Sequence, residues 1–430
     1  MFERFEGYRV NGDLSMLPRV FPVRQNFETK ALENVEEHVA REVARAIKET
    51  SLPAGAKVAL AVGSRGIARL QEIVRSTVNE LRRHGMEPFI VPSMGSHGEA
   101  TEEGQIEVLR GYGVTEESMG AKIRSCMDVV SLGEMRPGLP AYFDRVTFEC
   151  ADAVIPIARV KNHTTFRGDI ESGLHKMLCI GLGKHVGAQT LHGYGLEHFA
   201  TVIPEAGQYI MSKVSVPFGV AVVENASEQP ALIEAVLGAA FLKREPELLK
   251  ISSGMMARLC FDEIDVLVVQ EMGKNISGTG MDPNVTCRYQ TSYMPDGPLR
   301  VQRIVTLGLS KETHGNAMGV GMTDICTKRL LDSVNFNAGY TNAITARRID
   351  RVKLPLICAT DRDAIALALQ LSGGEKGGSK VVIIKNTLEI EQIYVSESLL
   401  SHVESHPQLS ATGNLQELEF DDKGALITLR

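Results

Sequence analysis

The 430-residue sequence has no tryptophan, few aromatic residues and no excess of positive charge. Lys and Arg number 46 against 53 Asp and Glu, so the formal net charge is −7 at pH 7. Proteins that bind nucleic acids or anionic membranes usually present a basic face, and the composition therefore argues against both kinds of partner. Aromatic residues make up only 5% of the chain, which is too few to suggest platforms for base stacking.

Long apolar runs are also missing. No window approaches the roughly 18 consecutive apolar residues that a membrane-spanning helix requires. The N-terminal stretch MFERFEGYRV mixes acidic and basic side chains and has no apolar segment typical of a secretory signal. We therefore expect a cytoplasmic protein that does not enter a membrane.

The cysteines do not form a recognisable spacing motif. The seven cysteines are odd in number, widely spread and never spaced as CxxC. This spacing argues against a disulfide framework, a zinc ribbon and an iron–sulfur site. Most of them are expected to be buried as small apolar residues.

The sequence does contain an alternation of short apolar runs with helical patterns. Apolar residues recur at helical spacing over residues 67–84, and Thr101 followed by two glutamates has the chemistry of a helix start. This alternation predicts an α/β fold with mainly parallel sheets covered by helices. The candidate strands are Val58–Val62, Pro88–Pro92, Ala153–Ala158, Phe218–Val223, Val266–Val269, Ile304–Leu309, Leu354–Ala359 and Lys380–Ile384.

The length suggests two or three domains at about 150 residues each. Residues 244–253 are mostly polar, and the strand pattern resumes at residue 261. We therefore predict an N-terminal α/β domain at residues 1–250 and a C-terminal α/β domain at residues 251–430.

Histidines are concentrated in one part of the chain. Five of the 11 fall between residues 163 and 198, where an even distribution predicts about one. The same stretch is rich in glycine and also holds lysines, which suggests a functional site. A solvated, glycine-rich surface loop is the alternative. The five are His163, His175, His185, His192 and His198.

Zinc is the first metal that a histidine cluster suggests. The HExxH motif is absent, and His185 and His192 are two helical turns apart, too far to share one metal from one helix. A zinc site would therefore need ligands from separate loops. An imidazole that is the sole protein ligand of a metal held mainly by an organic cofactor is the other possibility.

Three loops that follow predicted strands have the chemistry of a binding site. In the Gly63–Gly66 turn, free N–H groups favour an anion and Arg65 can bind a carboxylate or phosphate through two hydrogen bonds. His97 follows the next strand, at the edge where open α/β sheets bind ligands. Lys274 follows the strand Val266–Val269 in the same manner. A plain tight turn is the alternative for the first loop, and a solvated lysine for the last.

Together these residues resemble the lactate racemase family, the 2-hydroxy acid racemases and epimerases that depend on a nickel-pincer nucleotide. The similarity covers most of the chain and is strongest from Val62 to Tyr194. It implies two α/β domains with the ligand site in the cleft between them. It also implies a pyridinium mononucleotide whose two sulfurs and ring carbon hold nickel, supplied by cofactor-synthesis enzymes.

The resemblance assigns the cofactor residues. Lys176, at the end of the serine- and glycine-containing motif SGLHK, is implied as the lysine joined covalently to the cofactor. Ser172 and Gly173 of this motif, together with Ser64, are implied as further cofactor contacts. His192 follows Lys176 at the spacing that the family has for its nickel ligand, and it is implied as that ligand.

The resemblance also assigns the groups that act on the substrate. His97 corresponds to one acid/base histidine of the family and His163 to the other. The spacing from His163 to the cofactor lysine is wider than in lactate racemases, and His175 is the alternative for this role. Arg65 and Lys274 are implied as the groups that bind the substrate carboxylate.

Two turns depart from the family pattern. Lactate racemases have Asp-x-Thr-Arg-Pro where this chain has Gly63–Gly66, and His-Arg-Pro where it has His97-Gly98-Glu99. The resemblance therefore extends to the cofactor residues and not to lactate as the substrate. It implies inversion at C2 of a 2-hydroxy acid. The alternatives are a redox isomerase or dehydrogenase of a larger polyhydroxy acid with the same cofactor, and a noncatalytic protein that binds a nucleotide or a sugar acid.

Overall fold

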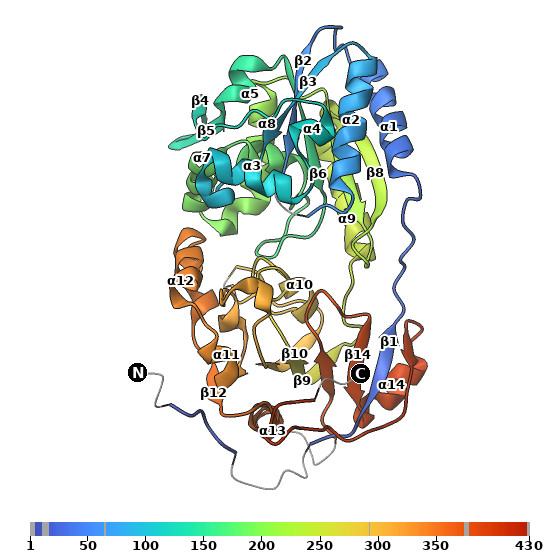
Figure 1. The fold of residues 1–430 in the computed structure, drawn as a ribbon, viewed down its shortest axis with the longest axis vertical. Helices are drawn as coiled ribbons and strands as arrows, with labels where there is room; N and C mark the ends of the chain where they lie inside the picture. Colours follow the sequence, from blue (N-terminus) through green and yellow to red (C-terminus); the bar gives the residue numbers. More distant parts are fainter. Residues whose placement is uncertain (1–4, 11–16, 64–65, 292, 374–377, 428–430) are drawn as a thin grey trace. The chain divides into compact units, whose positions relative to one another are not determined.

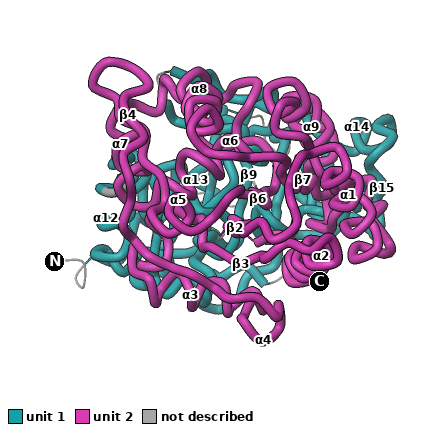
Figure 2. Tube along the Cα trace, turned by 90° about the horizontal axis from the view of Figure 1, so that it is seen from above, with its two compact units in different colours: residues 1–27, 257–430 teal, residues 28–256 magenta. Residues whose placement is uncertain are grey.

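The computed structural model describes residues 5–10, 17–63, 66–291, 293–373 and 378–427. The chain divides into two compact units (Figure 2). One unit is Glu28–Met256, and the other joins Met1–Phe27 to Ala257–Arg430. Each unit has its own sheet and its own buried apolar core.

The unit Glu28–Met256 is built on a five-stranded sheet (Figure 1). Its strands lie in the order β3-β2-β6-β7-β8, and neighbours are parallel except for β7 and β8. A separate antiparallel hairpin is formed by β4 and β5. The strands are β2 (Lys57–Val62), β3 (Glu87–Pro92), β4 (Val129–Arg136), β5 (Leu139–Asp144), β6 (Ala153–Arg159), β7 (Phe218–Glu224) and β8 (Pro230–Leu237).

Helices cover both faces of this sheet. Leu60 of β2 belongs to the core that includes α1 and α2, whereas its neighbour Ala61 belongs to the core on the opposite face, with α8 and α9. Because both faces are buried, the strands are continuous apolar runs, which is why the sequence predicts them. The helices are α1 (Val35–Glu49), α2 (Leu70–Arg83), α3 (Glu102–Gly111), α4 (Glu116–Met119), α5 (Arg145–Cys150), α6 (Leu174–Lys176), α7 (Lys184–Tyr194), α8 (Phe199–Met211) and α9 (Phe241–Met255).

The other unit is built on an eight-stranded sheet in the order β12-β11-β10-β9-β13-β14-β1-β15. The first five strands in this order are parallel, and the last three pair antiparallel. The strands are β1 (Val20–Gln25), β9 (Glu263–Val269), β10 (Arg300–Thr306), β11 (Ile325–Thr327), β12 (Leu356–Cys358), β13 (Val381–Ile384), β14 (Gln392–Ser396) and β15 (Leu409–Ala411). The helices are α10 (Pro283–Thr286), α11 (Lys328–Asp332), α12 (Phe336–Thr345), α13 (Asp361–Ser372) and α14 (Leu400–Ser405).

The segment Met1–Phe27, which the sequence assigns to the N-terminal domain, belongs to the C-terminal unit. The reason is that β1 lies between β14 and β15 and pairs with both strands. Gln25 of β1 is fully buried, and its amide bonds the carbonyl of Ile390 and the N–H of Cys260. The second change of unit follows Met256, close to the boundary expected from the polar stretch.

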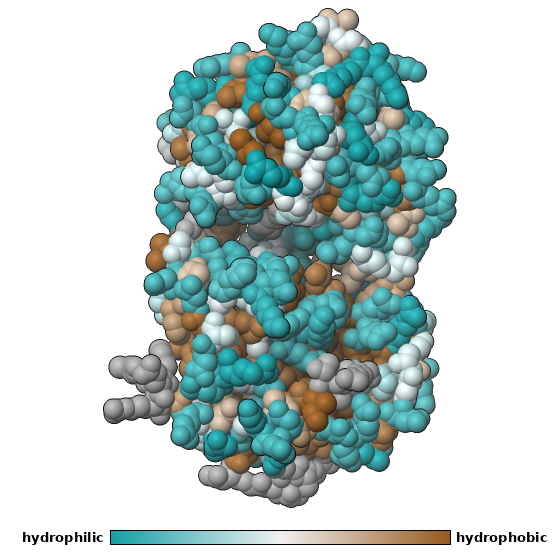
Figure 3. Space-filling view, in the orientation of Figure 1, coloured by the Kyte–Doolittle hydropathy of each residue, from teal (hydrophilic) through white to brown (hydrophobic). Residues whose placement is uncertain are grey.

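The predicted α/β class with mainly parallel sheets is confirmed, and every predicted apolar run overlaps a strand. All seven cysteines are free, and five of them are buried. Hydrophilic side chains cover most of the face of each unit seen in Figure 3. Within the described ranges, no helix combines the length and apolar character needed to cross a bilayer.

Candidate functional site

Two of the predicted site histidines lie in loops that leave the same edge of the five-stranded sheet. His97 follows β3 and His163 follows β6, and these strands flank β2 in the sheet. All three strands are parallel, so their carboxyl ends share one edge, the position where open α/β sheets bind ligands. Ser64 and Arg65 follow β2, but they lie outside the described residues. The structure therefore places the two histidine loops on either side of the carboxyl end of β2.

The loop after β3 carries His97 in an exposed position. Four of its residues have left-handed backbone angles: φ is 61° at Gly95, 65° at Gly98, 58° at Glu99 and 55° at Ala100. Glycine tolerates these angles, whereas the side chains of Glu99 and Ala100 make them unfavourable. The loop ends where Thr101 caps α3 by accepting a hydrogen bond from the N–H of Gly104 at 3.0 Å.

The loop after β6 holds His163 in a buried position, with 7% of the residue exposed. The backbone N–H of Thr165 donates to Nδ1 of His163 at 3.2 Å, and the Thr165 hydroxyl lies 2.9 Å from the same atom. A backbone N–H can only donate, so Nδ1 is the acceptor and the proton of the neutral ring is assigned to Nε2. The ring packs on Phe166, with 4.5 Å between the centroids.

Glu171 organises the His163 loop from within. Its carboxylate accepts the backbone N–H of His163 at 2.5 Å and lies 3.3 Å from the Arg167 guanidinium. Burial raises the pKa of Glu171, while the hydrogen bond from His163 and the charge of Arg167 oppose that rise. Two backbone hydrogen bonds between Lys161 and Ser172 close the loop at its base.

The segment after Ser172 carries Lys176, the predicted cofactor lysine, and His175, the alternative to His163. Lys176 ends the short helix α6 and is partly exposed. His175 is fully buried: Nδ1 lies 2.6 Å from the Glu245 carboxylate, and the Gln208 amide lies 2.9 Å from Nε2. Both ring nitrogens of His175 are therefore hydrogen-bonded to side chains of the same unit.

Glycines let this segment approach the sheet edge closely. After Lys176 the chain forms a π-helical turn, Met177–Gly181, a feature that often occurs at functional sites. The Ser93 hydroxyl, at the end of β3, donates to the carbonyl of Met177 at 3.2 Å. A Cβ on Gly63 would lie 2.9 Å from Cε of Met177, and one on Gly181 would overlap the Ser93 hydroxyl.

Gly173 is required for a related reason. A Cβ at this position would overlap the carboxylate of Glu245, the residue that holds His175. Glycine at the start of α6 therefore permits the buried His175–Glu245 pair directly before Lys176. Ser172 is partly exposed.

His192 lies on α7 and is half-buried. Its ring packs against Phe199 with 5.1 Å between centroids, and Phe199 in turn contacts Phe166 at 5.4 Å. Because Phe166 also packs on His163, four rings join the His163 loop to α7. The structure thus links, through packed rings, two histidines that belong to separate elements.

Lys184 is the other lysine of the cluster, and its surroundings differ from those of Lys176. It is fully buried, and its ammonium donates to the carbonyl of Pro92 at 2.5 Å and to the amide oxygen of Gln105 at 3.1 Å. The carboxylate of Asp144 lies 3.3 Å away. Burial lowers the pKa of Lys184, and the charge of Asp144 opposes that change. All three donors of this ammonium have an acceptor.

Lys274 belongs to the other unit and is exposed. Its backbone N–H donates to the Thr313 hydroxyl at 3.0 Å, and its ammonium donates to the side-chain oxygen of Asn342 at 2.7 Å. The loop that carries it follows β9, as the sequence predicts.

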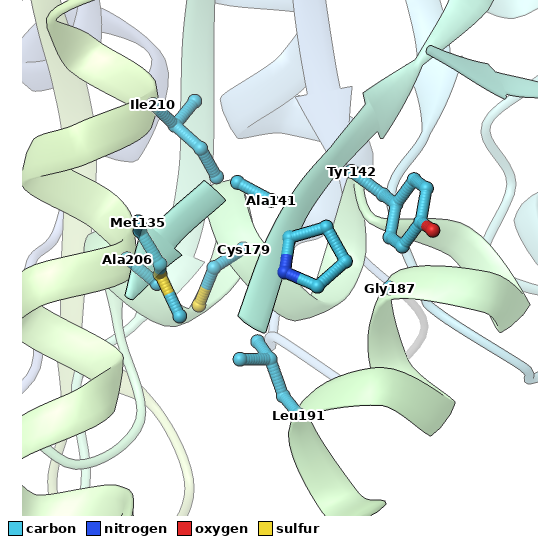
Figure 4. Close-up of a pocket in the computed structure, with 9 residues that line it drawn as sticks. Met135, Ala141, Tyr142, Cys179, Gly187, Leu191, Ala206 and Ile210 are labelled. Atoms are coloured by element: carbon cyan, nitrogen blue, oxygen red, sulfur yellow. The ribbon is translucent and has the colours of Figure 1, made fainter. Parts of the chain in front are cut away.

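A small apolar cavity lies away from the histidine loops, among β4, β5, the π-helical turn, α7 and α8 (Figure 4). Its volume of about 10 Å³ leaves room for about one water molecule and not for a nucleotide. Cys179 lines it, and burial raises the pKa of this thiol to about 12. A thiol with such a pKa is inert at neutral pH.

No group of three or more His, Cys, Asp or Glu side chains in the described part of the chain could hold a metal ion. A zinc site built from these residues alone would therefore lack ligands. A metal held mainly by a cofactor and by one imidazole requires no such group.

Several residues that shape the site carry no motif in the sequence. Gln105, Asp144 and Glu245 are buried polar residues in separate elements, and each bonds a residue of the histidine-rich segment or of the His97 loop. The N-cap pattern at Thr101 predicts the helix α3 and therefore places Gln105 on a helix. The sequence has no comparable signal for Asp144 or Glu245.

No protein-family model and no curated protein sequence matches this chain. Among solved structures, the lactate racemase apoprotein from Thermoanaerobacterium thermosaccharolyticum is similar, with a TM-score of 0.53 and 10% identity over 89% of this chain and 96% of that protein. A protein from Thermotoga maritima aligns with a TM-score of 0.49 and 14% identity over 63% of this chain and 70% of that protein. The chain therefore has a fold similar to that of the lactate racemase apoprotein.

Proposed function

We propose that the protein is a racemase or epimerase that inverts C2 of a 2-hydroxy acid by proton-coupled hydride transfer. The observation that carries this proposal is the gathering of the His97 loop, the His163 loop and the Lys176–His192 segment around one edge of a sheet. The similarity to the fold of the lactate racemase apoprotein supports it.

The residues fit a lysine-tethered nickel-pincer nucleotide. Lys176 is partly exposed, whereas Lys184 is buried with three acceptors, so Lys176 is the lysine that could be joined covalently to a cofactor. The glycines at positions 63 and 181 let the π-helical turn that follows Lys176 pack closely on the sheet edge. His192, half-buried on the next helix, would be the single protein ligand of nickel. Ser64, Ser172 and Gly173 would contact the nucleotide.

A hydride acceptor solves the chief difficulty of this inversion. Removal of the C2 proton would leave a very basic carbanion beside a carboxylate. A bound pyridinium cofactor would supply an acceptor for the C2 hydrogen and its electron pair, and loss of this hydride together with the hydroxyl proton converts the substrate to a planar 2-keto acid. The protein must then take the hydroxyl proton and return one to the oxygen when the hydrogen comes back to the other face.

His97 and His163 would move that proton, because an imidazole with an ordinary pKa near 6.5 both takes and gives protons at neutral pH. His97 is exposed after β3, whereas His163 is held by Thr165 and Glu171 after β6. Because they flank β2, they could approach a substrate from two sides. Proton transfer of this kind contributes roughly 10²–10⁴-fold to a rate.

Arg65 and Lys274 would bind the substrate carboxylate and hold it in place while the configuration at C2 is inverted. A guanidinium binds a carboxylate through two parallel hydrogen bonds, and an ammonium adds a second charge. Arg65 belongs to the unit Glu28–Met256 and Lys274 to the other unit, so the clamp would take one group from each.

The test is production of the protein together with cofactor-synthesis enzymes, followed by intact mass, nickel analysis and a screen of chiral 2-hydroxy acids in deuterated water. We expect a covalent adduct on Lys176, stoichiometric nickel and inversion without deuterium at C2, because the hydrogen returns as hydride. Lys176→Ala should abolish the adduct, and His192→Ala should lose nickel while keeping the adduct.

Other outcomes assign other functions. Deuterium at C2 would overturn the hydride mechanism, and an adduct on Lys184 would overturn the assignment of Lys176. Net oxidation of a polyhydroxy acid without inversion would identify a dehydrogenase with the same cofactor. Ligand binding without adduct or nickel would identify a noncatalytic binding protein.

A further inference from the structure

The network around Lys184 is unusual because all its side chains are charged or polar and fully buried. Lys184, Asp144 and Gln105 each have 0% exposure. Burial of an ammonium and a carboxylate is costly unless each is paired and hydrogen-bonded. Asp144 also accepts the N–H of Thr147 at 2.6 Å as the N-cap of α5. The structure therefore maintains this network at a desolvation cost that an apolar core would avoid.

The network ends on the loop that carries His97. The Lys184 ammonium donates to the carbonyl of Pro92, the last residue of β3. The Gln105 side-chain N–H₂ donates to the carbonyl of Gly95 at 3.0 Å and to the carbonyl of His97 at 3.3 Å. The oxygen of the same amide accepts from Lys184, which fixes the orientation of the amide.

The loop needs such support because its backbone is strained. Glu99 and Ala100 both have left-handed backbone angles, which are unfavourable for a residue with a side chain. Lys184 also has a left-handed backbone, with φ at 53°. Strained conformations persist only where the surrounding structure determines them, and they cluster at functional sites. Gly98 contributes by close packing, since a Cβ there would lie 2.6 Å from the backbone nitrogen of Gln105.

We propose that Lys184, acting through Gln105, is a positioning residue that holds the His97 loop and couples it to the start of α7. The inference rests on the proposed function for the role of His97, and on the hydrogen bonds alone for the support of the loop. It joins the proposed acid/base residue after β3 to the helix that carries His192. The Asp144 carboxylate and the Gln105 and Pro92 oxygens take the place of water around the ammonium.

The test compares two buried glutamines. Gln105→Met removes the amide and keeps a similar side-chain shape. Gln25→Met is the matched control, because Gln25 is also fully buried and its amide also bonds two backbone groups, in the other unit. Both variants should lose similar thermal stability. Only Gln105→Met should speed hydrogen exchange of the amides in residues 93–101, measured by peptide mass spectrometry.

The holoenzyme supplies the second measurement. Gln105→Met should lower kcat about 10–100-fold with KM within about threefold, because a small misplacement of an acid/base group costs rate more than binding. Gln25→Met should leave kcat unchanged. If Gln105→Met does not fold, Gln105→Asn keeps an amide that is one CH₂ shorter and should show the same pattern.

Each other result overturns the inference. Unchanged exchange of residues 93–101 in the Gln105 variant would show that the network does not hold the loop. Equal acceleration in the Gln25 variant would show a general loss of stability. Faster exchange with unchanged kcat would show that the loop needs no positioning. An inactive wild-type holoenzyme would instead contradict the proposed function, while the exchange measurement would still decide whether Gln105, the residue through which Lys184 acts, holds the loop.

Discussion

The two loops that carry the proposed acid/base histidines are held in different ways. The His163 loop is held by its own residues, since Thr165, Arg167 and Glu171 all lie within eight positions of the histidine. The His97 loop is held by Gln105, eight positions after the histidine, and this glutamine is in turn held by Lys184, which lies 79 positions farther along the chain. One imidazole is buried and the other is exposed.

The two loops therefore fix the position of a histidine in two different ways. The His163 loop orients its histidine through hydrogen bonds to a carboxylate and a threonine of the same loop. The strained His97 loop also depends on a residue of α7, which lies far from it in the sequence. The first route makes the histidine part of the folded core, whereas the second leaves it accessible.

The largest expected effect is on catalysis, and it should be shared by both loops. His97→Ala and His163→Ala should each lower kcat of the holoenzyme by about 10²–10⁴-fold, because each inversion needs both proton carriers. The two variants should differ in their free energy of unfolding. His163→Ala should lower the free energy of unfolding by about 1–3 kcal/mol, because it leaves the buried N–H of Thr165 without its acceptor. His97→Ala should change it by less than about 0.5 kcal/mol. Kinetics and urea denaturation measure both, and equal losses of stability would contradict the comparison.

A smaller effect is expected from the hydroxyl that contacts His163. Thr165→Val keeps the side-chain shape and removes the oxygen 2.9 Å from Nδ1. The loss of one buried hydrogen bond is worth about 0.5–1.5 kcal/mol, so kcat/KM should fall about 2–10-fold. Thr165→Ser restores the hydroxyl and should recover most of the activity. A serine variant as slow as the valine variant would mean that the methyl group matters and the hydroxyl does not.

The buried carboxylate of the His163 loop predicts a pH dependence of stability. Burial raises the pKa of Glu171, so the folded state holds this proton more tightly than the unfolded state, whose pKa is near the ordinary 4.5. The associated stability is present below about pH 4.5 and is lost as the pH rises through the raised value. Glu171→Gln keeps an acceptor for the His163 N–H and cannot ionise. The difference in unfolding free energy between variant and wild type should therefore grow in favour of the variant from pH 4 to 7, by urea denaturation. A constant difference would show that Glu171 does not titrate in this range.

The smallest effect is expected in the backbone of the His97 loop. Ala100→Gly removes the Cβ that makes a φ of 55° unfavourable, while it adds freedom to the unfolded chain. The protein should be stabilised by about 1 kcal/mol or less, visible as a small rise in Tm. Ala68→Gly, outside the loop and without a left-handed angle, is the control and should not stabilise. A loss of stability in Ala100→Gly would mean that the loop is not strained there.

The fold class follows from the sequence because apolar runs are a local property. The strands at Val58–Val62 and Ala153–Ala158 are buried on both faces, and their composition alone reveals them. The position of β1 could not be inferred in the same way. Its partners β14 and β15 lie near the opposite end of the chain, and no local pattern specifies such a pairing.

The candidate site, like the fold, has features that the sequence determines and features that only the tertiary structure determines. The sequence by itself determined the chemistry that is present: a histidine-rich segment, a lysine in SGLHK, and histidines after two strands. Only the tertiary structure decided which of these side chains are accessible. Lys176 and Lys184 are close in the sequence and chemically alike, yet one is partly exposed and the other is fully buried among three acceptors. Burial and hydrogen bonding depend on residues such as Asp144, Gln105 and Glu245, which reach the site from other helices and strands, and folding alone brings them there.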